Sequence, residues 1–174
     1  MADSDSQSPI PNPQSEIGVL YRIASLANSA PDAASAQGRI LATIMAAFPA
    51  DSGSLALLSP ETGLLEICIQ HGLPPDIGDF ALKPGQGVTG WVALHGKPLL
   101  VADIAAEPRY IAARAGVRSE MAAPLIVDGH TIGVINLDAD RLAAFTPAAL
   151  GRLARCAAEA GAVLHRLWQY ERLR

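Results

Sequence analysis

The chain has 174 residues, of which 50% are hydrophobic and 17% charged, with a formal net charge of −4. This composition is typical of one globular domain and excludes a disordered or coiled-coil chain, and the lack of a basic block argues against nucleic-acid binding. The N-terminus lacks signal-peptide features, and no apolar run reaches the ~20 residues of a membrane helix. With Cys68 and Cys156 far apart, we expect a cytoplasmic protein without membrane contact or disulfide framework.

The N-terminal part of the sequence predicts a tail followed by two helices. Residues 1–14 are rich in Ser, Asp and Pro, so they are expected to form a flexible tail. Apolar residues three or four positions apart then predict an amphipathic helix. Its stripe consists of Ile17, Leu20, Ala24 and Ala27. A second helix, with Ser29 or Asp32 as its N-cap, ends before Pro49. Its apolar face consists of Ile40, Leu41, Ile44 and Phe48.

Strand-length apolar runs separated by turn residues predict a sheet in the middle of the chain. The expected strands lie at residues 52–58, 64–70, 80–82 and 99–101, followed by a hairpin at 119–137. The glycine-rich segment 85–90 opens a helix that ends at Gly96. Residues 103–118 are expected to form a polar loop with one helical turn around residues 110–113. Because strands and helices do not alternate regularly, the order indicates an α+β fold with a mostly antiparallel six-stranded sheet.

The hairpin at residues 119–137 is the segment around which the sheet is organised. Asp128 and Gly129 favour a two-residue turn, because both tolerate the positive φ angles that such turns require. The runs on either side are apolar on both faces, which predicts strands in the middle of a sheet that is covered by helices. The second run ends in polar residues, Asn136 and Asp138, which face a cavity or begin a surface loop.

The register of this hairpin decides where Glu120 points. In a regular hairpin, Glu120 lies on the opposite face of the sheet from Asn136 and Asp138. A bulge would shift the register and bring all three side chains to one face. Pro124 lacks an N–H and would lie opposite Gly133, so an irregularity is plausible there. Glu120 is therefore either a pocket residue or a solvent-facing one.

Residues 146–174 predict a long C-terminal helix for signalling or dimerisation. Thr146 suits the N-cap and Pro147 the first helical position. The apolar stripe, spaced as in a coiled coil, consists of Leu150, Leu153, Ala157, Ala160, Leu164 and Leu167. Such a helix can leave an apolar seam uncovered, so we expect a homodimer through this stripe and the one at residues 17–27. The helical pattern continues to the last residues, which suggests a connection to a downstream module.

The order of these motifs resembles the GAF domain family. The matching segments are the glycine pattern at 85–96, Pro-Arg-Tyr at 108–110, Ser-Glu-x-x-x-Pro-Leu at 119–125 and Gly-x-x-x-Gly-Val-Ile-Asn-Leu at 129–137. With the terminal helices, the resemblance covers residues 15–174 as a single domain. It implies a six-stranded antiparallel sheet with the terminal helices on one face. A ligand pocket is implied on the other face, roofed by residues 85–118.

Within that family, the sequence is similar to free methionine-R-sulfoxide reductases. Those enzymes carry a cysteine in a Gly-Val-Cys-Gly element and another before Ser-Glu, and these positions hold Thr89 and Ala113 here. Neither side chain can form the sulfenic acid or the disulfide of that chemistry, so no catalytic residue is expected. The resemblance implies that the acidic side of the pocket is retained, as Glu120, Asn136 (an Asp in those enzymes) and Asp138.

Trp91, Tyr110 and Met121 are the large side chains near the expected roof and floor. They can complete the pocket as apolar walls, or they can be ordinary core residues. The candidate ligand-binding set consists of Trp91, Tyr110, Glu120, Met121, Asn136 and Asp138. This acidic lining predicts a ligand that carries an amine or several hydroxyl groups rather than a bare anion.

Other site chemistries fit the sequence less well. Residues 85–90 match the glycine pattern of dinucleotide-binding loops, but no βαβ unit surrounds them. Cys68 and His71 are too few for a metal site, so no metal ligands are predicted. The signatures of cyclic-nucleotide and bilin-binding GAF branches are absent, and His71, His95 and His130 lie in turn contexts unsuited to haem. No cofactor is identified from the sequence.

These observations favour a small-molecule-sensing domain that is not an enzyme. It would dimerise through its terminal helices and pass its ligand state to an output module, such as a kinase, a cyclase or a transcription activator. Two alternatives stay open. One is an enzyme related to the sulfoxide reductases, which the missing cysteines disfavour, and the other is a dimerisation module that binds no ligand.

Overall fold

The computed structural model describes Asn12 and residues 15–173. The expected flexible tail at residues 1–14 therefore lies, apart from Asn12, outside the described residues. The helices are α1 (Glu16–Ser29), α2 (Ala33–Ala47), α3 (Gly87–His95) and α4 (Pro147–Glu171), with short 3₁₀ helices η1 (Pro75–Asp79) and η2 (Ile104–Ala106). The strands are β1 (Ser52–Leu58), β2 (Leu65–His71), β3 (Ala81–Leu82), β4 (Leu99–Val101), β5 (Ser119–Val127) and β6 (His130–Ala139).

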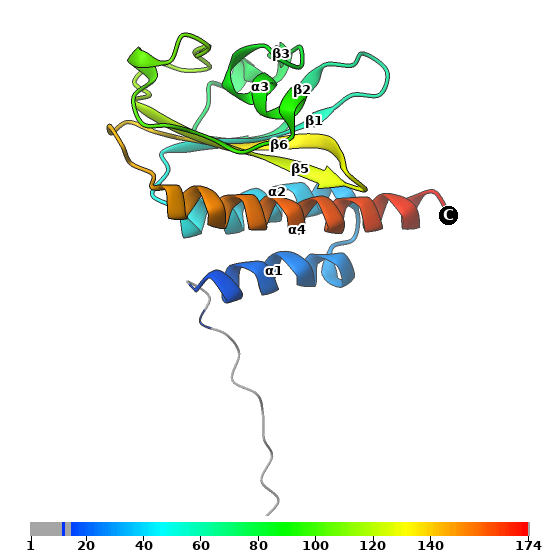
Figure 1. Cartoon of the computed structure of the whole chain (residues 1–174). Helices are drawn as coiled ribbons and strands as arrows, with labels where there is room; N and C mark the ends of the chain where they lie inside the picture. Colours follow the sequence, from blue (N-terminus) through cyan, green and yellow to red (C-terminus); the bar gives the residue numbers. More distant parts are fainter. Residues whose placement is uncertain (1–11, 13–14, 174) are drawn as a thin grey trace, which may run out of the picture.

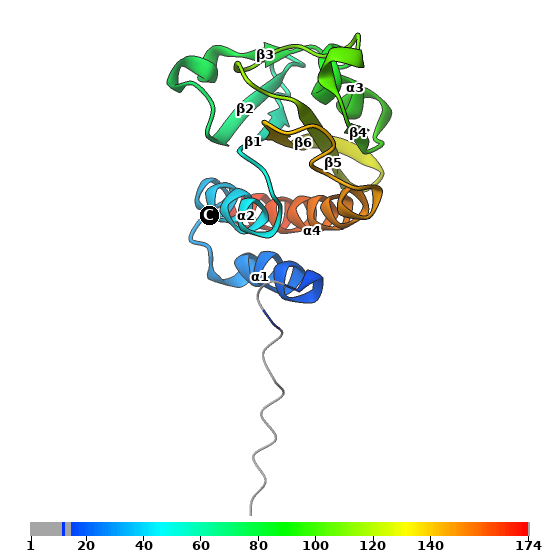
Figure 2. The ribbon, with the colours of Figure 1, turned by 90° about the vertical axis from the view of Figure 1, so that its left-hand side faces the viewer.

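The six strands form one antiparallel sheet in the order β3-β2-β1-β6-β5-β4. Helices α2 and α4 lie side by side under one face of this sheet, and α1 forms a further layer beneath them (Figures 1 and 2). Helix α3 and the long loops cover the opposite face (Figure 1). The expected α+β architecture, with the terminal helices on one face, is confirmed.

Side-chain caps determine where the helices begin. Asp32 accepts a hydrogen bond from the Ser35 amide at 2.7 Å, which identifies it rather than Ser29 as the N-cap of α2. Thr146 accepts one from the Ala149 amide at 3.1 Å, so the start predicted for α4 is confirmed. Both bonds satisfy an amide that the first turn of a helix leaves without an intrahelical partner.

The main core lies between the sheet and the helices α1, α2 and α4. Large side chains of the sheet point to this face, among them Leu55, Met121 and Leu137, and all three are fully buried. Helix α4 meets them with the apolar stripe predicted from the sequence, of which Leu153 and Leu164 are completely buried. The α4 stripe is thus core within one chain, not a seam between two. None of the helices between residues 15 and 173 combines the length and the hydrophobicity needed to cross a membrane.

The buried face of α1 only partly matches the predicted stripe. Val19, Ile23 and Leu26 are at most 3% exposed and pack against the other helices, whereas Ile17 is 69% and Tyr21 59% exposed. The sequence contains two overlapping apolar stripes in this helix, and packing on α4 selects the one that includes Ile23. Of the predicted stripe, Leu20 and Ala27 are partly buried against the main core, Ala24 is half-buried, and Ile17 is exposed.

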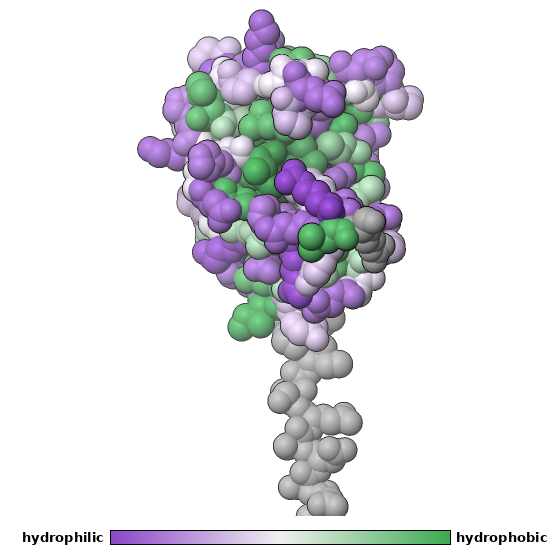
Figure 3. Space-filling model, turned by 90° about the vertical axis from the view of Figure 1, so that its right-hand side faces the viewer, coloured by the Kyte–Doolittle hydropathy of each residue, from purple (hydrophilic) through white to green (hydrophobic). Residues whose placement is uncertain are grey.

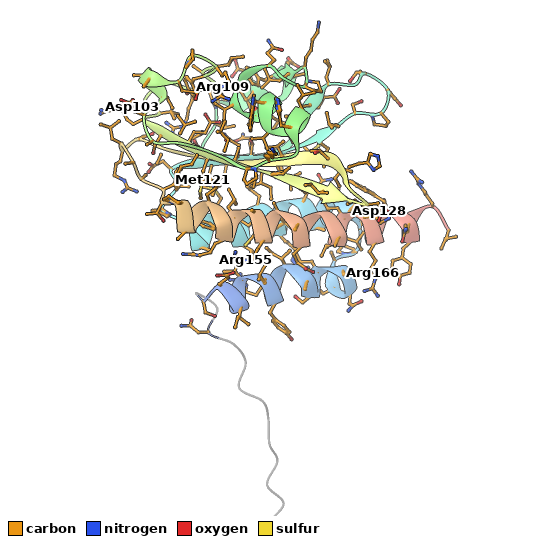
Figure 4. The ribbon with its side chains drawn as sticks, in the orientation of Figure 1. Asp103, Arg109, Met121, Asp128, Arg155 and Arg166 are labelled. Carbon is orange, nitrogen blue, oxygen red and sulfur yellow. The ribbon has the colours of Figure 1, made fainter. Side chains whose placement is uncertain are left out.

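Polar contacts tie α4 to its neighbours near both of its ends. Close to its start, the Arg155 guanidinium forms an ion pair with Glu16 of α1, and Figure 4 shows Arg155 between the two helices. At its end, the Glu171 carboxylate accepts a hydrogen bond from the Ala33 amide at the start of α2, at 2.8 Å. Both contacts join α4 to segments far away in the sequence.

The loops differ from the prediction in two places. Residues 103–118 contain their helical turn at η2 and not around residues 110–113, because the Asp103 carboxylate accepts from the Ala105 amide at 3.0 Å and caps that turn. The predicted loop after β2 contains η1, which begins at Pro75. Proline at a first helical position leaves no amide unsatisfied, so this short helix is locally favoured.

We predict that Leu164→Asp unfolds the chain, because it places an unpaired carboxylate in the main core. The same substitution at Leu173 is expected to leave the unfolding free energy within about 0.5 kcal/mol of wild type, because that side chain is 84% exposed. Urea unfolding followed by circular dichroism measures both variants. A folded Leu164→Asp protein with an unchanged transition midpoint would contradict the position assigned to α4.

Candidate functional site

A β-bulge in the central hairpin places Glu120 beside Asp138. Next to the turn the strands pair regularly, but the register then shifts, so that Leu125 pairs with Gly133 and Ile132 is the additional residue. Beyond this point Glu120 pairs directly with Asp138. The hypothesis that a bulge brings the polar residues to one face is confirmed, although the irregularity lies one pair closer to the turn than Pro124.

The face of the sheet opposite the main core carries small side chains and leaves a cavity of about 40 Å³. Its floor comes from the three central strands, with Ser54 and Ala56 on β1, Glu120 on β5 and Asn136 and Asp138 on β6. Its roof comes from the first turn of α3 and from the loop between β4 and β5. The roof residues are Gly87, Val88, Thr89, Tyr110, Ile111 and Ala113. This volume is enough for a few water molecules or the head group of a small ligand.

The polar floor of the cavity is only partly satisfied by the protein. The Asp138 carboxylate accepts from the Ser52 hydroxyl at 3.1 Å and from the Asn136 amide nitrogen at 3.0 Å. Glu120 and Asp138 are each only 4% exposed. In the described part of the chain, Oε2 of Glu120 and Oδ1 of Asn136 are buried and have no hydrogen-bond partner. Oδ1 of Asn136 is an acceptor, and Oε2 of Glu120 is an acceptor when its carboxyl group is ionised, so the floor then offers two unfilled positions to hydrogen-bond donors.

Burial sets the protonation of the two carboxyl groups. It raises the pKa of Glu120 well above its usual 4.5, and the negative charge of Asp138 raises that pKa further. Burial also raises the pKa of Asp138, but hydrogen bonds from Asn136 and Ser52 oppose this effect. Asp138 therefore keeps its charge more readily, and Glu120 is the member of the pair that holds a proton. Burial, with these neighbouring carboxyls, raises the pKa of Tyr110 to about 12, so its hydroxyl is neutral.

Arg114 holds the roof loop against the floor from outside the cavity. Its Nε donates to the Ser52 hydroxyl at 2.7 Å, and its terminal nitrogen donates to the Asp140 carboxylate at 2.6 Å. Sequence reasoning missed both Ser52 and Arg114. The alternation of small residues at Ser52, Ser54 and Ala56 was a usable signal for a cavity, but the partners of Arg114 depend on the path of a loop that no local pattern specifies.

Four of the six predicted ligand-binding residues line the cavity, namely Tyr110, Glu120, Asn136 and Asp138. The prediction of a pocket wall is wrong for the other two. Met121 follows Glu120 in the strand and so points into the main core on the opposite face. Trp91 stacks on the His95 ring, with centroids 4.2 Å apart, and lies 5.2 Å from the guanidinium of Arg109. Figure 4 places Arg109 above the sheet, on the side of α3, and Met121 at the sheet.

No thiol lines the cavity within the described residues. Thr89 and Ala113, the positions matched to redox cysteines, both lie in its wall. Cys68 is exposed on β2, where partial burial of its sulfur raises the thiol pKa, and Cys156 is buried in the main core. Between residues 15 and 173, no three His, Cys, Asp or Glu side chains gather as a metal site would require.

A larger, more open groove lies beside the C-terminal end of α4, with a volume of about 720 Å³. Its walls include Leu57, Ile132 and Trp168, and Figure 3 shows apolar surface gathered in a hollow at this end of the molecule. Among the described residues, the buried polar atoms without partners belong to the smaller cavity and not to this groove. Convergent polar groups with shifted pKa values mark a binding site better than volume does, so the smaller cavity is the candidate site.

Comparison with known families and curated proteins identifies the family that the sequence motifs resemble. The family model described as "GAF domain" matches residues 32–164. The chain is 36% identical over 64 residues to GAF domain-containing protein A of Dictyostelium discoideum, which is 37% of this chain and 40% of that protein. It is 35% identical over 78 residues to Protein YtsP of Bacillus subtilis, which is 45% of this chain and 46% of that protein. The matches thus span less than half the length of these relatives.

Solved structures show the same architecture over nearly the whole chain. Free methionine-R-sulfoxide reductase from Neisseria meningitidis, in complex with its substrate, matches with a TM-score of 0.80 and 26% identity over 89% of this chain and 91% of that one. The GAF domain of a phosphoenolpyruvate-protein phosphotransferase from Coxiella burnetii matches with a TM-score of 0.79 and 21% identity, over 92% and 99% of the two chains. The second likeness supports the fold alone.

We predict that Glu120→Gln raises the melting temperature, by an increment that grows as the pH rises above about 4.5. A carboxyl whose pKa is raised by folding binds its proton more tightly in the folded chain than in the unfolded one, so wild type loses stability with rising pH. The glutamine has no proton to lose. Differential scanning calorimetry between about pH 4 and pH 8 measures the increment, with the exposed Glu61→Gln as control. Parallel curves for wild type and Glu120→Gln would refute the assignment.

Proposed function

Because the chain belongs to the GAF domain family, we propose that it is a small-molecule sensor and not an enzyme. One observation carries this proposal. The cavity keeps a polar, partly unsatisfied floor at Glu120, Asn136 and Asp138 but has Thr89 and Ala113 at the positions where related reductases carry cysteines. Such a cavity has the groups for recognising a ligand and lacks the groups for changing it by thiol chemistry.

The reductase alternative rests on the similarity to the Neisseria enzyme. Reduction of a sulfoxide by a thiol requires a cysteine that attacks the sulfur and is then released by a second thiol. Cys68 is exposed on β2 and Cys156 is buried in the main core, so neither lines the cavity. The alternative is therefore disfavoured by the chemistry of the wall, whereas a binding function needs none of the missing groups.

The sheet offers a direct route from the cavity to the helices. In β5 and β6, residues that line the cavity alternate with residues of the main core, so Glu120 is followed by Met121 and Asp138 is preceded by Leu137. A ligand that pulls on the two carboxyl groups therefore shifts side chains that pack on the other side. Helix α4 would carry this change to an output module such as a kinase, a cyclase or a transcription activator.

The outer face of α1 supports dimerisation. Ile17 and Tyr21 lie there and are 69% and 59% exposed, whereas the neighbouring Leu20 is partly buried against the main core. An isologous contact between two copies of α1 would bury them and place the two α1 helices between the α4 helices of the two copies. We propose this helix, and not the buried stripe of α4, as the dimer contact of a cytoplasmic sensor.

We predict that a screen of amino acids, amines, nucleobases and simple anions contains a stabilising ligand and that this ligand is returned unchanged. At one hundred times its Kd, such a ligand stabilises the folded chain by about 2.7 kcal/mol. Asp138→Ala should abolish the shift, and Glu61→Ala should leave it intact. Free methionine-R-sulfoxide with thioredoxin is included and should yield no methionine. Turnover that is lost in Cys68→Ser would overturn the proposal in favour of the enzyme.

We also predict that wild type is a dimer in solution and that Ile17→Asp makes it monomeric without unfolding it. Two carboxylates brought together in an apolar contact are costly to bury, so the dimer should weaken by at least tenfold. Light scattering over a concentration series measures the mass, and Leu173→Asp, at a position that is 84% exposed at the far end of α4, is the matched control. A wild-type monomer at all practical concentrations would rule this contact out.

A further inference from the structure

We propose that the cavity binds a small organic cation, whose ammonium or amidinium group donates hydrogen bonds to Glu120 and Asn136. This inference rests on the sensing function proposed above and names the chemical class of its ligand. Glu120 and Asn136 are 4% and 9% exposed, and both line the cavity. Each holds one buried oxygen without a protein partner in the described chain. A ligand that fills both positions brings at least two N–H or O–H donors.

The charges around the cavity favour a cation over a neutral donor. Two carboxyl groups face each other across β5 and β6, and among the described lining residues none is Lys, Arg or His. The nearest cationic side chains are used elsewhere. Arg114 donates to Ser52 and Asp140 outside the cavity, and Arg109 forms an ion pair with Glu107. Hydrogen bonds from Asn136 and Ser52 stabilise the negative charge of Asp138, and the charge of Arg114 adds to this from outside the cavity, so a ligand cation would be the first positive charge within the cavity.

A hollow next to the cavity also carries negative charge. A shallow hollow of about 340 Å³ shares Phe80 and Ala113 with the cavity, and two exposed carboxylates, Asp76 and Asp79, stand at its rim. Exposed charges of one sign beside a binding site raise the local concentration of the opposite charge and speed its association. A sugar or another neutral polyol gains nothing from these two groups, whereas a cation is attracted by them. The two carboxylates at the hollow therefore favour a cationic donor over a neutral one, whereas the floor alone would accept either.

The remaining walls limit the size and the polarity of the ligand. Around these polar groups the cavity is lined by Ala56 and Val134 on the sheet and by Val88 and Tyr110 at the roof. At the roof, the first turn of α3 presents amide groups that its N-cap residue, Gln86, does not cap with its side chain. The cationic group therefore belongs at the floor, with a short apolar body above it. The roof can accept an additional acceptor group on the same ligand.

The proton held by Glu120 gives a further way to distinguish a cation from a neutral ligand. Glu120 faces Asp138 on β6, and Glu107 of the roof loop adds a second negative charge near it. Tyr110 of the same loop is neutral, and Arg114 lies behind Ser52. A cation that binds at the floor replaces the proton of Glu120, so the affinity for a cation rises with pH. The affinity for a neutral ligand of the same shape has no such dependence.

Calorimetric titration with four probes of similar size tests the proposal: n-propylammonium, guanidinium, 1-propanol and butyrate. The two cations should bind wild type at pH 7 and more tightly at pH 8, and 1-propanol and butyrate should bind at least tenfold more weakly. Glu120→Gln keeps the shape of the side chain and should weaken n-propylammonium about tenfold, because a charge-assisted hydrogen bond is lost. Glu61→Gln makes the same change of charge on an exposed turn and should have no effect.

The contribution of Asp76 and Asp79 to ligand association is tested separately. Replacing Asp76 and Asp79 together by Asn should slow the association of n-propylammonium several-fold at low salt and leave its dissociation unchanged. Aminobutyrate, which carries both an ammonium and a carboxylate, distinguishes a simple cation from a zwitterion that also uses the roof.

Binding of 1-propanol or butyrate as tight as that of n-propylammonium, or an unchanged affinity in a folded Glu120→Gln protein, would overturn the cation proposal. If another class of ligand binds and depends on Asp138, only the cation proposal fails and the sensing function stands. If no class binds, the sensing function fails as well.

Discussion

The arrangement of the candidate site depends on one additional residue in a strand. Ile132 has no partner on β5, and its insertion moves every pair beyond it by one position. Without it, Glu120 would enter the apolar space between the sheet and α4, where a carboxyl group has no partner and its burial is costly. With it, the carboxyl groups of Glu120 and Asp138 lie on one face, and Met121 and Leu137 fill the core on the other.

The sheet therefore separates two buried regions that differ in packing and in polarity. The side that faces α2 and α4 is closely packed with large aliphatic side chains, which tolerate little displacement. The side that faces α3 has small residues, buried acceptors and a roof held from outside by Arg114. Strain introduced on the second side is not absorbed on the first, because a packed core transmits displacement.

Local chemistry made much of the fold predictable. Asp32 and Thr146 were identifiable as caps because a short polar side chain before an apolar stripe has few other uses there. The Asp128–Gly129 turn followed in the same way, and both residues have the positive φ that the turn requires. Which residues lie on which face of the sheet, in contrast, depends on the bulge, and Gly133 beside the bulge lies close to the third strand, β1. A Cβ added at Gly133 would lie 2.3 Å from the Ala56 carbonyl oxygen of β1, so this approach requires glycine.

The candidate site was predictable where residue type specifies direction, and not where size was the only guide. Asn136 and Asp138 follow from alternation after Val134. Trp91 and Met121 are large enough to form a wall, but size does not determine which way a side chain points. The stripe of α1 was only partly right for a related reason, because that helix is apolar on two sides and only packing on α4 decides between Ile17 and Ile23.

The ties near the two ends of α4 have a mechanical consequence. The Arg155–Glu16 pair joins its early turns to α1, and Glu171 joins its last turn to the start of α2. These contacts connect α4 to both neighbouring helices, and the Glu171 hydrogen bond holds its last turn against the start of α2. A displacement of α4 would therefore have to move α1 and α2 with it or break these two contacts.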